Sequence, residues 1–140
     1  MLHDEGGHGV IDVFLLGLLF LAPLVWGLGV LADLHRAALA TTAAAREAGF
    51  DAAAADDPSQ ADAAVEDAVR RAFVDQSMDA TGSRVRWSAS PNLERGGRVE
   101  VIVAYPVTVL QAPFLGRVSG PSIWVTAKHV APIDLYGSRE

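Results

Sequence analysis

Cysteine is absent from this chain of 140 residues, and lysine occurs once, at Lys128. Without thiols the protein can form neither a disulfide bond nor a cysteine-ligated zinc site, and cysteine usage does not indicate its compartment. The formal net charge is −6. A nucleic-acid surface needs a concentrated patch of Lys and Arg, so we expect no nucleic-acid partner.

Recognisable catalytic motifs are also absent from the sequence. It contains no HExxH zinc motif, no P-loop, no dinucleotide-binding fingerprint and no GxSxG nucleophile motif. The histidines are too scattered to suggest a metal site, and they are His3, His8, His35 and His129. We therefore expect a protein that is not an enzyme, with no cofactor, no metal and no small-molecule substrate.

One long stretch near the N-terminus is almost free of charge. Residues 10–34 read VIDVFLLGLLFLAPLVWGLGVLADL, and between Val10 and Ala32 the only ionisable residue is Asp12. At about 1.5 Å per residue, a helix of about 25 residues exceeds the roughly 30 Å hydrocarbon core of a bilayer. The stretch is too long for a cleaved signal and continues into alanine-rich sequence with no proline before Pro58. We predict a retained membrane anchor and one long helix over residues 8–56.

Small residues and one proline interrupt the apolar run. Gly17, Gly27 and Gly29 would let another helix approach closely, and Pro23 is tolerated in lipid when neighbouring groups satisfy the freed carbonyl. We consider these four as candidate helix-packing residues. The alternative is that they reflect the ordinary composition of membrane helices.

Asp12 is the residue that breaks the apolar pattern. An ionised carboxylate about one turn inside such a run costs several kcal/mol unless it is paired or reaches the interface. One interpretation is that Asp12 lies at the headgroup level, where it caps the helix and is favoured by the macrodipole. The other rests on spacing, because cleavage after Gly7 would create an amine at His8 with the acid at the fifth mature position. Such an amine and acid can pair between neighbouring subunits.

Residues 7–13 (GHGVIDV), followed by the apolar stretch, resemble the N-terminus of type IV pilins and TadE proteins. In that pattern a prepilin peptidase cuts after glycine, and an acidic residue, usually glutamate, follows five places on. Further along, the segment AAREAG is similar to the Ala-Ala-Arg-Glu-Gly segment that closes the conserved N-terminal helix of TadE and TadG. Its residues here are Ala44, Ala45, Arg46, Glu47, Ala48 and Gly49.

The resemblance implies a minor pilin or pseudopilin of a tight-adherence (Tad, or Flp) type IV pilus or a related secretion system. Residues 1–7 would be a short leader, removed by the prepilin peptidase between Gly7 and His8. The implied partners are the membrane, other pilin or pseudopilin subunits, the prepilin peptidase and the Tad assembly platform. The resemblance also implies a single-pass protein of the cell membrane with its head outside the cytoplasm, available for an extracellular pilus. Taken alone, Arg36 and Arg46 after the span would favour the opposite orientation.

Residues 57–140 are expected to form an α+β head. Asp57 before Pro58 and a helical spacing of apolar residues predict a helix over residues 58–76, with Glu66 and Arg70 spaced as an ion pair. Alternating patterns predict strands over residues 84–90, 98–107 and 122–130, paired antiparallel. In the second strand we expect one set to face the helices, namely Val99, Val101, Val103 and Tyr105. The fold class is pilin-like: a long N-terminal helix, a second helix and a small three-stranded antiparallel sheet.

A second hypothesis is an unprocessed, single-pass anchored binding module that recruits an envelope partner. Its candidate contacts are Trp87, Trp124 and the apolar loop around Phe114, residues that the pilin-like hypothesis assigns to the core. The loop over residues 110–116 would pack under the sheet or contact a neighbouring subunit. Processing after Gly7 and the response to Asp12→Ala distinguish the two hypotheses.

Overall fold

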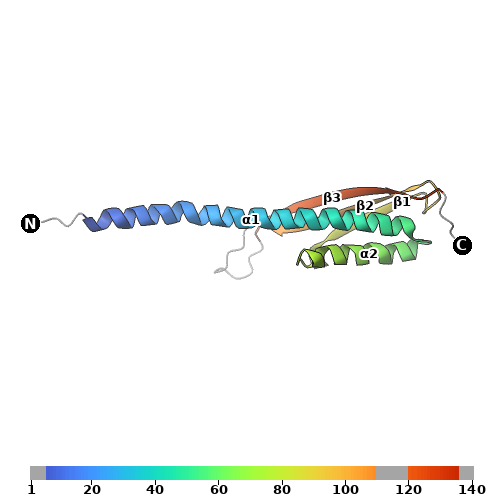
Figure 1. Cartoon of the computed structure of the whole chain (residues 1–140), viewed down its shortest axis with the longest axis horizontal. Coiled ribbons are helices and arrows are strands. Elements are labelled where there is room, and N and C mark those ends of the chain that lie inside the picture. Colours follow the sequence, from blue (N-terminus) through green and yellow to red (C-terminus); the bar gives the residue numbers. More distant parts are fainter. Residues whose placement is uncertain (1–5, 110–119, 136–140) are drawn as a thin grey trace, which may run out of the picture. The chain divides into compact units, whose positions relative to one another are not determined.

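The computed structural model, which describes residues 6–109 and 120–135, confirms the predicted α+β layout (Figure 1). The elements in chain order are α1 (Gly6–Ala54), α2 (Pro58–Asp75), the short 3-10 helix η1 (Ala80–Gly82), β1 (Arg84–Ser90), β2 (Arg98–Thr108) and β3 (Ser122–Pro132). The strands β2 and β3 extend slightly beyond their predicted ends, and α2 ends one residue earlier than predicted. The loop over residues 110–116, with Phe114, lies outside the described residues.

Helix α1 contributes to two compact units. The first unit ends at Asp33, and its described part is helical, without interruption at Pro23. The second unit, Leu34–Glu140, contains the remainder of α1 and all other described elements. The helix predicted over residues 8–56 therefore serves both units, and only its later part belongs to the head.

The sheet has the order β1-β2-β3, and both pairs are antiparallel, as predicted. In the register, Trp87 of β1 lies opposite Val101 of β2, which lies opposite His129 of β3. Side chains alternate between the two faces of a strand. Residues on one face are buried or half-buried against the helices, and those on the other face are mostly exposed. The helices of the head thus cover a single face of the sheet.

Glycines shape the turn between β1 and β2. Gly96 has φ 74°, a left-handed conformation that glycine adopts without a steric penalty. A Cβ at Gly97 would lie 2.0 Å from the backbone oxygen of Ser90, so a side chain there would disrupt the hairpin. These two constraints explain why glycine occupies both positions 96 and 97.

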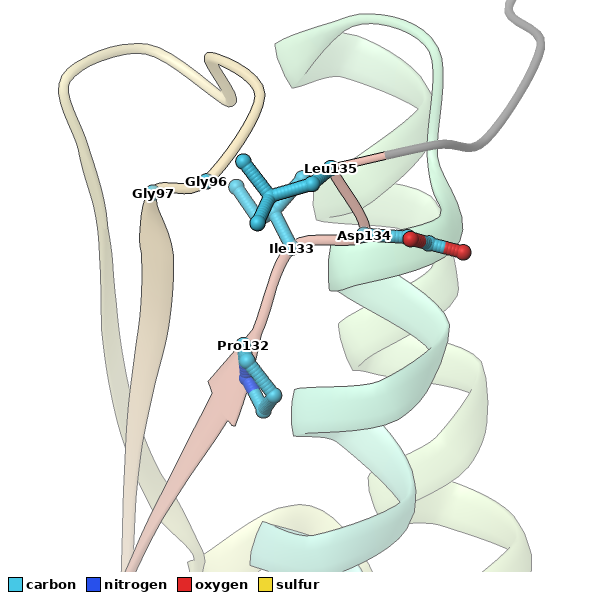
Figure 2. A pocket seen from close by; sticks show the side chains of 6 residues that line it. All are labelled: Gly96, Gly97, Pro132, Ile133, Asp134 and Leu135. Carbon is cyan, nitrogen blue, oxygen red and sulfur yellow. The ribbon is translucent and has the colours of Figure 1, made fainter.

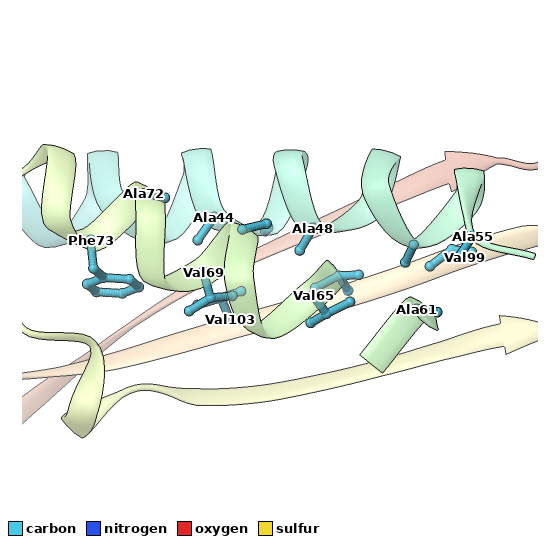
Figure 3. Close-up of a cluster of buried hydrophobic side chains, with 14 of the residues drawn as sticks. Ala44, Ala48, Ala55, Ala61, Val65, Val69, Ala72, Phe73, Val99 and Val103 are labelled. Atoms are coloured by element: carbon cyan, nitrogen blue, oxygen red, sulfur yellow. The ribbon is translucent and has the colours of Figure 1, made fainter. Parts of the chain in front are cut away.

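The head core begins with a stripe of small residues on α1. They recur three or four positions apart, as one helical face requires, and alanine lets the helix backbone lie close to its neighbours (Figure 3). The fully buried members are Ala37, Ala40, Ala44, Ala48 and Ala52. Thr41 is the polar exception, and its hydroxyl donates to the carbonyl of Ala37 at 2.8 Å.

Larger side chains from α2 and β2 fill the space opposite this stripe. Val65, Val69 and Phe73 come from α2, and the valines predicted to face the helices on β2 are fully buried. Tyr105 is half-buried, with its ring centroid 4.9 Å from that of Phe73. The predicted inward set of β2 is therefore confirmed, and the core combines a small-residue helix with larger residues around it.

Polar contacts define the start of α2 and attach it to α1. The carboxylate of Asp57 accepts hydrogen bonds from the Ser59 hydroxyl and from the backbone N–H of Gln60 at 2.9 Å, and these bonds lower the pKa of Asp57 below its ordinary value. Along the helix, Asp67 pairs with both Arg70 and Arg71. Arg71 also reaches Asp51 of α1 at 2.9 Å. The structure therefore pairs Arg70 with Asp67, whereas the spacing in the sequence suggested Glu66.

Replacement of Phe73 by alanine should strongly destabilise the head. Phe73 is fully buried, so its truncation removes contacts on several sides and leaves a cavity, at a cost of about 3–5 kcal/mol in the free energy of unfolding. The neighbouring Val74 is 63% exposed, so Val74→Ala should change that free energy by less than about 0.5 kcal/mol. Denaturant unfolding of the full chain in detergent, followed by circular dichroism, measures both. Equal effects of the two substitutions would contradict the core described here.

Candidate functional site

The N-terminal unit presents apolar side chains to the surroundings on every side of its helix. Apart from the half-buried Val30, the exposed fractions of its large apolar side chains range from 49% at Trp26 to 72% at Val10 and Phe14. Within the part of the chain that the structure describes, α1 is the one helix that is long and apolar enough to cross a membrane, by length and composition. A continuous apolar surface of this kind is costly in water and marks a contact with lipid or with other proteins.

The predicted helix-packing residues lie within this surface. A Cβ built at Gly17, Gly27 or Gly29 would meet no atom within 4 Å. No packing within the single chain therefore requires a small residue at these positions, and the space beside them is open to a partner. Pro23 lies inside the same uninterrupted helix.

Asp12 is exposed on α1, among apolar neighbours. The backbone of Gly7 and His8 belongs to the first turn of the same helix. Because residues four apart share a helix face, the backbone of His8 lies about one turn before Asp12 on that face. No described residue forms an ion pair with Asp12, so the arrangement leaves its carboxylate available to another molecule.

The segment AAREAG, centred on Arg46 and Glu47, divides between core and surface. Its alanines, Ala44, Ala45 and Ala48, are buried in the head, whereas Arg46 and Glu47 are exposed. Gly49 is buried where α1 crosses β3, and a Cβ there would lie only 2.8 Å from Cδ2 of His129. The small residues of the segment thus have a packing role, and Gly49 is small because an imidazole fills the adjacent space.

His129 has a structural role that the sequence did not reveal. Its ring lies 5.1 Å from that of Phe50, and the guanidinium of Arg46 lies 5.9 Å from the centre of the Phe50 ring. The Nε2 atom of His129 is buried and has no hydrogen-bond partner among the described residues. The alternation of Val125, Ala127 and His129 on β3 is the signal that could have placed this histidine toward the helices.

The two tryptophans of the head lie on different faces of the sheet. Trp87 is half-buried on the helix side, and its Nε1–H donates to the Asp62 carboxylate at 2.9 Å. Trp124 is 42% exposed on the opposite face, with the Arg84 guanidinium 4.5 Å from its ring centre. Of the tryptophans considered as partner contacts, Trp124 is the accessible one.

Two open hollows can be described on the surface of the head. One, of about 430 Å³, lies at the turn end of the sheet, where Ile133 and Leu135 extend toward Gly96 and Asp134 points the other way (Figure 2). The other, of about 220 Å³, is lined by Arg86, Trp87, Ser88, Glu100 and Ile102. Across residues 6–109 and 120–135, no group of three or more histidine and carboxylate side chains is placed to hold a metal ion.

No family model, curated protein or solved structure matches this chain. The functional argument therefore depends on the residues and contacts described above.

Substitution of Gly49 tests the packing role of the segment. Gly49→Ala should destabilise the head by about 1–3 kcal/mol, because the added methyl collides with His129. In a His129→Ala background the collision is absent, and the same substitution should stabilise the protein by up to about 1 kcal/mol through helix propensity. A double-mutant cycle of unfolding free energies measures this change of sign. The same effect of Gly49→Ala in both backgrounds would show that His129 does not restrict this position.

Proposed function

We propose that this chain is a TadE-like minor pilin or pseudopilin, a structural subunit for assembly of a Tad (Flp) type IV pilus or a related secretion system. In this proposal the apolar part of α1 anchors the chain in the cell membrane as a single span. The head lies outside the cytoplasm, and the processed subunit enters a helix-packed assembly. Its partners would be other pilin-like subunits, the prepilin peptidase and the Tad assembly platform.

The observation that carries the proposal is the change in character along α1. Up to Leu31 its large apolar side chains are exposed, apart from the half-buried Val30, whereas from Ala37 onward one alanine face is buried in the head. Burial of a large apolar side chain contributes about 1.5–3 kcal/mol, so the exposed part strongly favours lipid or other helices over water. A subunit that is inserted in a membrane and then packed in a fibre needs a helix with an apolar surface. Lipid covers this surface first, and other helices cover it in the fibre.

The start of α1 supports the assembly step. Cleavage after Gly7 would make the amine of His8 the N-terminus, about one helical turn before Asp12. In an apolar surrounding a charged amine and a charged carboxylate each need a partner, because the cost of an unpaired charge is high. Pairing the amine of one subunit with Asp12 of the next would satisfy both charges and set the axial position of the subunits.

The binding-module hypothesis has one observation in its favour. Trp124 is accessible on the outer face of the sheet, where an aromatic side chain beside an arginine suits a protein contact. In that alternative the chain keeps its N-terminus, and the head recruits an envelope partner. Asp12 would then have no assembly role.

Processing is the first test of the pilin-like proposal. When the chain is expressed with its own prepilin peptidase, the mature protein should begin at His8, and Gly7→Leu should abolish this cleavage. Gly17→Leu is the matched control, since Gly17 has open space around it and lies away from the cleavage position. Intact-mass spectrometry measures each N-terminus. A wild-type chain that still begins at Met1 would favour the binding module.

Removal of the Asp12 charge tests the assembly step. Asp12→Ala and Asp12→Asn should lower incorporation into sheared fibres or cross-linked assemblies by more than about tenfold, since loss of one partner of a buried charge pair costs about 2–5 kcal/mol. Asp12→Glu should retain most assembly because it keeps the charge. The amount in the membrane fraction should stay unchanged in all variants. Normal incorporation of Asp12→Ala would rule out the pairing role.

A further inference from the structure

The face of the sheet turned away from the helices is basic, although the whole chain is acidic. Its charged residues are Arg84, Arg86, Arg98, Lys128 and a single carboxylate, Glu100. Lys128 pairs with Glu100 at 2.8 Å, and Arg84 lies over Trp124. Arg86 and Arg98 are exposed and have no ion-pair partner among the residues that the structure describes. We call this surface the basic sheet face.

Helix α2 and its flanking loops carry the opposite charge. Residues 56–79 contain two arginines, Arg70 and Arg71, and seven acidic residues, which are Asp56, Asp57, Asp62, Glu66, Asp67, Asp75 and Asp79. Asp67 pairs with both arginines. On the flank of α2 beside β1, Glu66 is exposed without an ion-pair partner in the described chain, and Asp62 accepts only the Trp87 hydrogen bond. We call Asp62 and Glu66, one turn apart, the acidic α2 flank.

We propose that the basic sheet face of one copy of this chain docks the acidic α2 flank of a second copy. The cations that lack a partner, Arg86 and Arg98, match in sign the carboxylates at Asp62 and Glu66. The hollow of about 220 Å³ beside Arg86 can accept side chains from the partner, and the exposed Trp124 offers an aromatic anchor at the same face. Charge complementarity of this kind selects the partner and its orientation.

The contact has to form between molecules. Within one chain α2 packs on the helix side of the sheet, so its acidic flank cannot reach the basic face on the other side. Because the two surfaces differ, each docked copy keeps one free surface of each kind, and the contact can repeat along a line. The inference goes beyond the proposed function, since it requires neither cleavage after Gly7 nor pairing at Asp12.

Cross-linking of the full chain in detergent provides the test, and the absence of native cysteine gives a clean background. One tagged copy carries Ser88→Cys on the basic sheet face, and a differently tagged copy carries Ala63→Cys beside the acidic α2 flank. At low salt a short thiol-reactive cross-linker should join them at least about fivefold more often than it joins Ser88→Cys to Thr42→Cys, an exposed position of α1. High salt should reduce the yield.

Charge reversal then identifies the interacting groups. Arg86→Glu with Arg98→Glu in the Ser88→Cys copy should remove the excess cross-linking. Asp62→Lys with Glu66→Lys in the Ala63→Cys copy should restore it. Unfolding curves check that each variant folds. If loss of the Asp62 hydrogen bond to Trp87 destabilises the head, Glu66→Lys alone replaces the double substitution.

Several results would overturn the inference. One is a cross-linking yield equal to that of the Thr42→Cys control. Another is a yield that does not change when Arg86 and Arg98 are reversed. The third is a predominance of symmetric dimers joined through Ser88→Cys. A lipid occupant is the remaining alternative. If reversal leaves the cross-link intact but abolishes binding to phosphatidylglycerol vesicles, the basic sheet face binds anionic headgroups and the docking proposal fails.

Discussion

The close approach of α1 to the rest of the head is the interaction on which this structure depends. A face made of alanine, with Gly49 against the His129 side chain, allows the helix backbone to lie against α2 and the sheet. Phe73 and the valines of β2 then fill the space that the small residues leave. Larger residues on α1 would separate the layers and expose that core, because protein interiors tolerate little added volume.

The same helix meets a different requirement before it reaches the head. In the described part of its first unit no large apolar residue is buried, and nearly all of them are exposed. Such a surface is stable only when lipid or other helices surround it, because contact of its apolar side chains with water is unfavourable. One continuous helix thus combines a segment that needs an external partner with a segment that completes an internal core. This combination is what the pilin-like proposal requires of a subunit.

Charges of opposite sign lie on different parts of the head surface. Cations gather on the sheet face without helices, and carboxylates gather around α2, so an acidic chain presents one basic side. The arginines of α2 are already occupied by Asp67 and Asp51. Exposed ion pairs contribute little to stability, so this distribution matters more for recognition between molecules than for the fold.

The order and type of the elements followed from local patterns in the chain. Apolar run length, helical spacing and strand alternation depend on neighbouring residues, and they predicted α1, α2 and all three strands within about two residues at each described end. Contacts between distant segments did not follow from those patterns. That Gly49 meets His129, that Trp87 turns inward to Asp62 and that Arg71 reaches Asp51 depended on how the layers pack and which rotamers they allow. The basic sheet face likewise exists only because the sheet register brings cations from three strands, far apart in sequence, to one side.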